Sequence, residues 1–165
     1  MGGRSFVDRV EVLRDSWLER RELRELSASH DFESQFRLLA TIYGWAASAV
    51  TDIKTVYADS LAIALSAAPG LSDGTPAFTV AFADRCLVTF SASEKRRAGA
   101  SRWFVAVSIS AGRGGAVDAA GPDRKTGSWT RGRLEDVLLS VLGAYERSLT
   151  EEARRGYPRL QSRGA

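Results

Sequence analysis

Four cations lie close to a tryptophan in the segment from Lys95 to Trp103 of this 165-residue chain: Lys95, Arg96, Arg97 and Arg102. A similar mixture follows before the last predicted helix, formed by Lys125, Trp129, Arg131 and Arg133. Cations neutralise phosphates, and an indole stacks on a base or holds a guanidinium. We therefore expect these eight residues to bind nucleic acid or an acidic protein. The alternative is a solvated hairpin tip, with Trp103 turned towards the core like Val105 and Val107.

The distribution of charge agrees with an acidic partner. Residues 1–58 contain eight Lys and Arg and nine Asp and Glu, so this third of the chain is close to neutral. Residues 84–133 contain ten basic residues against four acidic ones. Local asymmetry of this kind is typical of a surface that meets an anion.

Few residues have the types and settings that catalysis requires. His30 is the only histidine and lies in a polar turn, while Cys86 lies in an apolar strand. Neither Ser–His–Asp, nor Cys–His, nor zinc chemistry is expected from such a set, and no phosphate-binding glycine motif is present. We predict a protein without catalytic residues, metal site or cofactor. A ligand-binding cup or an enzyme site between a curved sheet and the last helix is the alternative.

Two long helices are predicted at the start of the chain. Ser5 and Asp8 resemble a capping box, and apolar residues at helical spacing follow to about Leu26. A polar break from Ser27 to Asp31 precedes a second helix with a seven-residue apolar repeat that runs from Phe32 to Tyr57. A short polar turn between two helices favours an antiparallel helical hairpin over residues 1–58.

An antiparallel sheet is predicted over residues 60–110. A strand is favoured at 60–66, where a continuation of the helix is the alternative. Apolar residues of one parity then alternate through 77–92, as one bent strand or as two strands that turn at 83–85: Phe78, Val80, Phe82, Cys86, Val88 and Phe90. Trp103, Val105, Val107 and Ile109 predict a further strand. The sheet is thus a meander of three or four strands.

The rest of the chain predicts a long loop at 111–128, a helix at 131–155 and a disordered tail at 159–165. The helix carries Leu134, Leu138 and Val141 on one face, and Gly156 and Pro158 are expected to stop it. We therefore expect a single α+β domain over residues 1–158, with the last helix packed on the sheet. A single cysteine and the lack of a signal peptide favour the cytoplasm, without membrane contact.

The repeat of the second helix also predicts an oligomer. A stripe of roughly 40 Å is longer than a small sheet covers. Part of this stripe is therefore expected to meet another chain, in a homo-oligomer interface that uses Phe32, Phe36, Tyr43 and Trp45. The alternative is that these side chains pack on the sheet and the first helix. The whole pattern predicts a non-enzymatic binding or assembly module.

Overall fold

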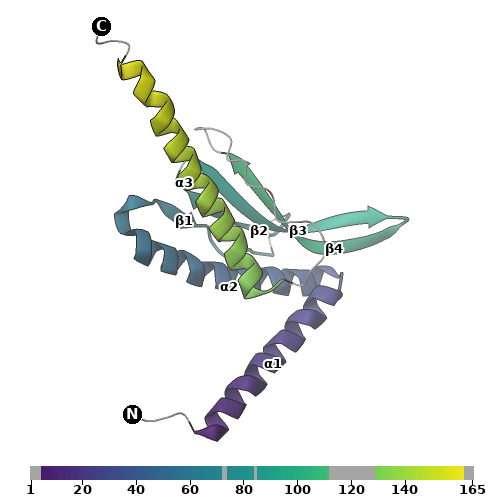
Figure 1. The fold of residues 1–165 in the computed structure, drawn as a ribbon. Coiled ribbons are helices and arrows are strands. Elements are labelled where there is room, and N and C mark those ends of the chain that lie inside the picture. Colours follow the sequence, from purple (N-terminus) through teal and green to yellow (C-terminus); the bar gives the residue numbers. More distant parts are fainter. Residues whose placement is uncertain (1–4, 72–73, 84, 112–128, 162–165) are drawn as a thin grey trace.

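The structure, a computed structural model, describes residues 5–71, 74–83, 85–111 and 129–161. Two helices, α1 (Phe6–Ala28) and α2 (Phe32–Tyr57), come first, and a 3₁₀ turn, η1 (Ala58–Ser60), follows them. Four strands then form one sheet, and the helix α3 ends the described chain (Figure 1). The predicted α+β class is confirmed.

Both N-terminal helices begin at a polar cap. At α1 the backbone N–H of Asp8 donates to the Ser5 hydroxyl at 3.1 Å, and the Ser5 N–H donates to the Asp8 carboxylate at 2.9 Å. At α2 the Asp31 carboxylate accepts from the Ser34 N–H at 2.8 Å. These bonds satisfy N–H groups that the first helical turn leaves without partners, so each cap fixes where its helix begins.

The sheet is an antiparallel meander in the order β1 (Ile63–Leu65), β2 (Ala77–Phe82), β3 (Cys86–Arg97) and β4 (Ala100–Ala111). The residues of shared parity pair across β2 and β3, as Phe78 with Phe90 and Val80 with Val88. The chain turns between these strands at Ala83, where φ is +50°. A tighter turn joins β3 to β4, since both Ala98 and Gly99 have positive φ, as two-residue hairpin loops require.

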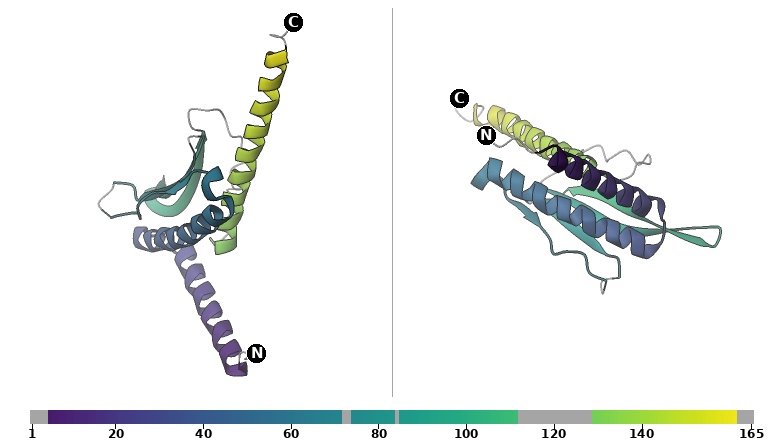
Figure 2. Two further views of the ribbon diagram at one scale, coloured as in Figure 1. Left: turned by 90° about the vertical axis from the view of Figure 1, so that its left-hand side faces the viewer. Right: turned by 90° about the horizontal axis from the view of Figure 1, so that it is seen from below.

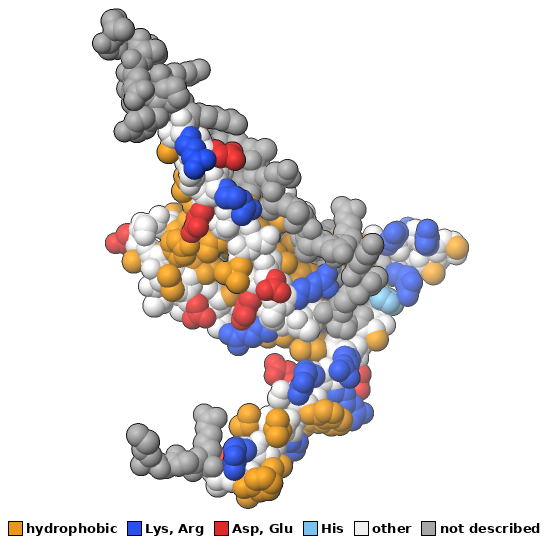
Figure 3. Space-filling model, viewed as in Figure 1, with side chains coloured by type: hydrophobic (Ala, Val, Ile, Leu, Met, Phe, Trp, Pro, Cys, Tyr) orange, Lys and Arg blue, Asp and Glu red, His pale blue; other side chains and the backbone are white. Residues whose placement is uncertain are grey.

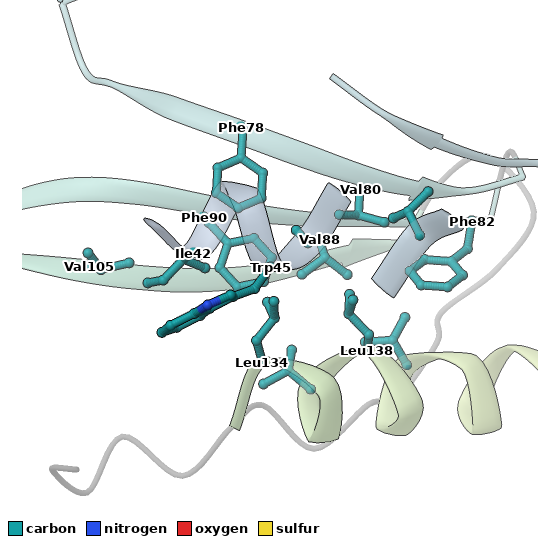
Figure 4. Close-up of a cluster of buried hydrophobic side chains, with 14 of the residues drawn as sticks. Ile42, Trp45, Phe78, Val80, Phe82, Val88, Phe90, Val105, Leu134 and Leu138 are labelled. Atoms are coloured by element: carbon teal, nitrogen blue, oxygen red, sulfur yellow. The ribbon is translucent and has the colours of Figure 1, made fainter. Parts of the chain in front are cut away.

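The core lies between one face of the sheet and the helices α2 and α3 (Arg131–Gln161). Figure 4 shows Phe78, Phe90, Leu134 and Leu138 meeting in this layer. Because side chains alternate along a strand, the opposite face of the sheet carries mainly Ala, Ser and Thr. Large apolar side chains are therefore concentrated on the helix-covered face.

The helix α1 lies outside this core. Figures 1 and 2 show it leaving the body at the turn with α2, and only Leu23 and Leu26, near that turn, pack against the core cluster. The two helices therefore diverge instead of packing along their length. None of the helices in the described residues is long and apolar enough to cross a membrane.

Two predicted boundaries were wrong. Residues 58–60 form the 3₁₀ turn, so the strand expected at 60–66 covers only 63–65. The helix expected at 131–155 continues to Gln161, through Gly156 and Pro158, and includes the first residues of the tail expected at 159–165. Gly and Pro lower the helix propensity by about 1 and 3 kcal/mol, but they do not by themselves decide where a helix ends. The loop predicted at 111–128 lies almost wholly outside the described residues.

The core position of Leu138 gives a stability prediction with a matched control. Leu138 is buried, whereas its neighbour Leu139 is 60% exposed. We expect Leu138→Ala to lower the free energy of unfolding by about 2–5 kcal/mol, through lost apolar burial and a cavity. Leu139→Ala should cost less than about 1 kcal/mol. Urea unfolding of the two variants checks this, and equal losses would contradict the placement of α3.

The α2 cap gives a prediction on pH. Hydrogen bonds from the Ser29 hydroxyl and from Ser34 lower the pKa of Asp31 to about 2. The pKa of an Asp in an unfolded chain is about 3.9, so the ionised cap stabilises the fold above pH ~4 and loses this effect as the pH falls towards 2. Asp31→Ala should lower the unfolding temperature at pH 7. The difference from the parent should shrink between pH 4 and 2, and a difference independent of pH would contradict the cap.

Candidate functional site

The ribbon formed by β3 and β4 carries part of the predicted basic surface at its end. It extends beyond the helices, with basic side chains at its tip (Figures 1 and 3). Lys95 pairs with Arg102 and Arg97 with Ala100, so all three cations lie on the face opposite the core side. Among the described residues, no ion pair or hydrogen bond involves these three side chains. Lys95, Arg97 and Arg102 therefore give one face of the ribbon tip a concentrated positive charge.

Arg96 lies on the other face of the ribbon and is neutralised. Its guanidinium is 3.1 Å from the Glu94 carboxylate, which also accepts a hydrogen bond from the Ser101 hydroxyl. The Ser101 hydroxyl and the Arg96 guanidinium hold the pKa of Glu94 below its ordinary value, so the carboxylate stays ionised beside Arg96. The four cations that are close in sequence therefore separate into three unneutralised charges and one ion pair.

Phe104 lies beside the three cations and was missed in the sequence. Its side chain is 40% exposed, and its partner across the strand pair, Ser93, is not a core residue. Because side chains alternate along β4, Phe104 lies on the same face as Arg102, opposite the core side. We call Lys95, Arg97, Arg102 and Phe104 the tip cluster. Strand alternation could have revealed Phe104. It lies between Trp103 and Val105 in β4, so its side chain points to the face opposite these two core-facing residues. Trp103 itself is half-buried and contacts Phe32 edge-on at 4.8 Å.

The second predicted group of basic residues is used within the fold. Trp129 is only 6% exposed and packs edge-on against Phe90, at 5.9 Å between ring centroids. The Arg133 guanidinium lies 4.4 Å from the centre of the Trp129 indole. Arg131 donates hydrogen bonds to Glu135 and, at 3.0 Å, to Ser48 of α2. A buried indole of this kind presents no open face to a base, and Lys125 lies outside the described residues.

The side chains predicted as an oligomer interface pack within one chain. Trp45 belongs to the core and is 8% exposed, and Tyr43 lies edge-on to Phe78 at 5.2 Å. The Tyr43 hydroxyl also donates to the Ser66 carbonyl at 3.0 Å. Phe32 and Phe36 are half-buried and contact each other. The interface stays a prediction, but little of these four side chains remains free to meet another chain.

Among the described residues, more than half of the exposed large apolar side chains lie on α1. Phe6, Val10, Leu13 and Trp17 follow helical spacing and form what we call the α1 stripe. Phe6 is 74% exposed, Leu13 65% and Trp17 55%, and Figure 3 shows apolar and basic side chains together along this helix. Phe, Leu and Trp side chains are rarely all exposed along one helical stripe. An exposed apolar surface of this kind is typical of a site that binds another molecule.

Arginines border the α1 stripe. The guanidinium of Arg9 lies 5.9 Å from the Phe6 ring centre, and that of Arg21 lies 5.7 Å from the Trp17 ring. Trp17, Arg20, Arg21 and Arg24 line a shallow surface depression of about 220 Å³. Small-molecule sites are usually enclosed and occupy about 300–1,000 Å³. The depression therefore fits a protruding side chain better than a free ligand.

The residues considered for catalysis do not gather in one place. His30 is exposed in the turn between α1 and α2, where its carbonyl accepts from the Trp103 N–H at 2.8 Å. Cys86 is buried, and burial raises the pKa of its thiol, so the group stays protonated. The described residues contain no group of three or more His, Cys, Asp or Glu side chains arranged to hold a metal ion.

Comparison of this chain with models of known protein families, with curated proteins and with solved structures finds no match.

Proposed function

We propose that this protein is a non-enzymatic binding and assembly module. The observation that carries this proposal is the α1 stripe, which leaves Phe6, Leu13 and Trp17 more than half exposed at the end of an otherwise well-packed fold. Burying such side chains releases about 25 cal/mol per Å² of apolar surface, which favours association with another chain. α2, α3 and the sheet form the body that presents α1.

A second copy of this chain, as in the predicted homo-oligomer, or a different protein would cover the α1 stripe. Either occupant agrees with assembly. We also place the protein in the cytoplasm, because its single cysteine, Cys86, cannot form an internal disulfide and is buried. The alternative of a ligand-binding cup receives less support, since the space between sheet and helices is filled by core side chains.

Nucleic-acid binding by the tip cluster is a second candidate function. The observation in its favour is that Lys95, Arg97 and Arg102 lie on one face without a neutralising partner among the described residues, next to the exposed ring of Phe104. Like charges directly opposite each other destabilise a strand pair. A phosphate backbone along this face would relieve that repulsion, and a base could stack on Phe104.

The salt dependence of binding tests the second candidate. Each neutralised phosphate adds about 0.7–0.9 to the slope of log affinity against log salt. Arg97→Ala with Arg102→Ala should therefore weaken the binding of oligonucleotides and flatten the slope by about one to two. Fluorescence anisotropy with single- and double-stranded oligonucleotides at several salt concentrations measures both effects.

Arg96→Ala is the control, because Arg96 lies on the other face and is already paired with Glu94. It should leave the slope nearly unchanged. An equal effect of Arg96→Ala would show that only the overall charge matters. No binding even at low salt would end the nucleic-acid proposal.

A further inference from the structure

The charges of α1 are sorted by face, although their sum is close to zero. At 100° per residue, all five arginines of the helix lie within about 80° of the centre of the α1 stripe. These are Arg9, Arg14, Arg20, Arg21 and Arg24. All six carboxylates lie about 90° or more from that centre: Asp8, Glu11, Asp15, Glu19, Glu22 and Glu25. The α1 stripe therefore lies on the basic side of the helix, although Val7, Val12 and Leu18 are also exposed outside it.

The stripe has the geometry of a coiled-coil seam. Its members are spaced by four, three and four residues, and Arg20 and Arg24 continue the same two rows. The seam is narrow, with Arg14 and Arg21 along one border and Arg9 on the other. These border positions are the ones that choose a partner helix by charge. The seam is thus apolar in its first half and cationic in its second.

A second copy of the chain fits this seam poorly. In an antiparallel pair, each border faces the same border of the partner, so Arg14 and Arg21 would face arginines. In a parallel pair, Arg9 would face Arg14, and Arg20 and Arg24 would each meet their own copies. Arg14 and Arg21 are ion-paired on their own helix, with Asp15 and Glu25 at 3.1 Å, but both pairs are exposed and stabilise little. The other carboxylates of α1 lie on the far side of the helix in both arrangements. Like charges oppose self-association through α1.

We propose that α1 docks an acidic amphipathic helix of a different protein. Such a helix would place apolar residues against Phe6, Leu13 and Trp17, and carboxylates against the border arginines and against Arg20 and Arg24. Three observations support this occupant: the uncovered stripe, the arginines around it, and the depression beside Trp17 that can receive a side chain. Among the described residues, Arg9, Arg20 and Arg24 form no ion pair. The inference rests on the proposed role of α1 in assembly.

A pair of designed peptides tests this inference on the full-length protein. Both peptides have three heptads with Leu at the seam, and they carry either Glu or Lys at all border positions. Self-repulsion keeps each peptide from pairing with itself at neutral pH. We expect the Glu peptide to bind in fluorescence anisotropy and the Lys peptide to bind at least about tenfold more weakly. Equal binding of both peptides would overturn the charge argument.

Two variants of the protein assign the binding to α1. Leu13→Ser with Trp17→Ser should abolish binding of the Glu peptide without changing the unfolding temperature, because both side chains are exposed. Arg14→Glu with Arg21→Glu should weaken it about tenfold and favour the Lys peptide. Arg37→Glu with Lys54→Glu changes the net charge equally on exposed positions of α2 and should leave the preference intact. If this control lost its preference for the Glu peptide over the Lys peptide, the preference would depend only on the net charge of the protein.

Two further probes separate this inference from the proposed function. Light scattering of the protein alone should give the monomer mass of 17.9 kDa. A dimer that the Leu13→Ser and Trp17→Ser variant dissociates would replace the acidic partner by a second copy. Binding to phosphatidylserine vesicles without binding to the Glu peptide would replace it by an anionic membrane. Either result keeps α1 as a binding surface, whereas no binding in any of these assays would overturn the proposed function as well.

Discussion

Four aromatic side chains in contact with one another hold the sheet and the helices α2 and α3 together. Phe78 and Phe90 stack across β2 and β3 at 4.8 Å with nearly parallel rings. Tyr43 of α2 meets the first ring edge-on, and Trp129, immediately before α3, meets the second. Aromatic pairs of this kind stabilise beyond their buried area. The same contacts fix the register of the central strands and the positions of both covering helices.

This packing also determines what remains outside. α2 and α3 cover one face of the sheet, and the core is closed without α1, which adds only Leu23 and Leu26 at its margin. The β3–β4 ribbon likewise continues past the last buried pair of residues, to a turn at Ala98 and Gly99. Substitutions on α1 or at the ribbon tip are therefore expected to have little effect on the core.

Much of the fold followed from periodicity, because a buried face imposes one. The shared parity of Phe78, Val80, Val88 and Phe90 predicted their pairing, and the repeat of residues 32–57 predicted α2. Trp129 was misread as a surface residue, since a side chain outside any periodic element carries no signal of its burial. The proposed binding surface on α1 was missed for another reason. Charge was summed along the sequence, whereas on a helix it is distributed by angle.

The arginines of α1 also lower the cost of leaving an apolar stripe exposed to water. Guanidinium groups over the rings of Phe6 and Trp17 cover part of the apolar surface while keeping their charge in water. They also oppose the approach of the same face of another copy. A partner with carboxylates at matching positions meets attraction where a second copy meets repulsion. In the proposed complex, the arginines that cover part of the stripe in the free protein would also select the partner that removes the stripe from water.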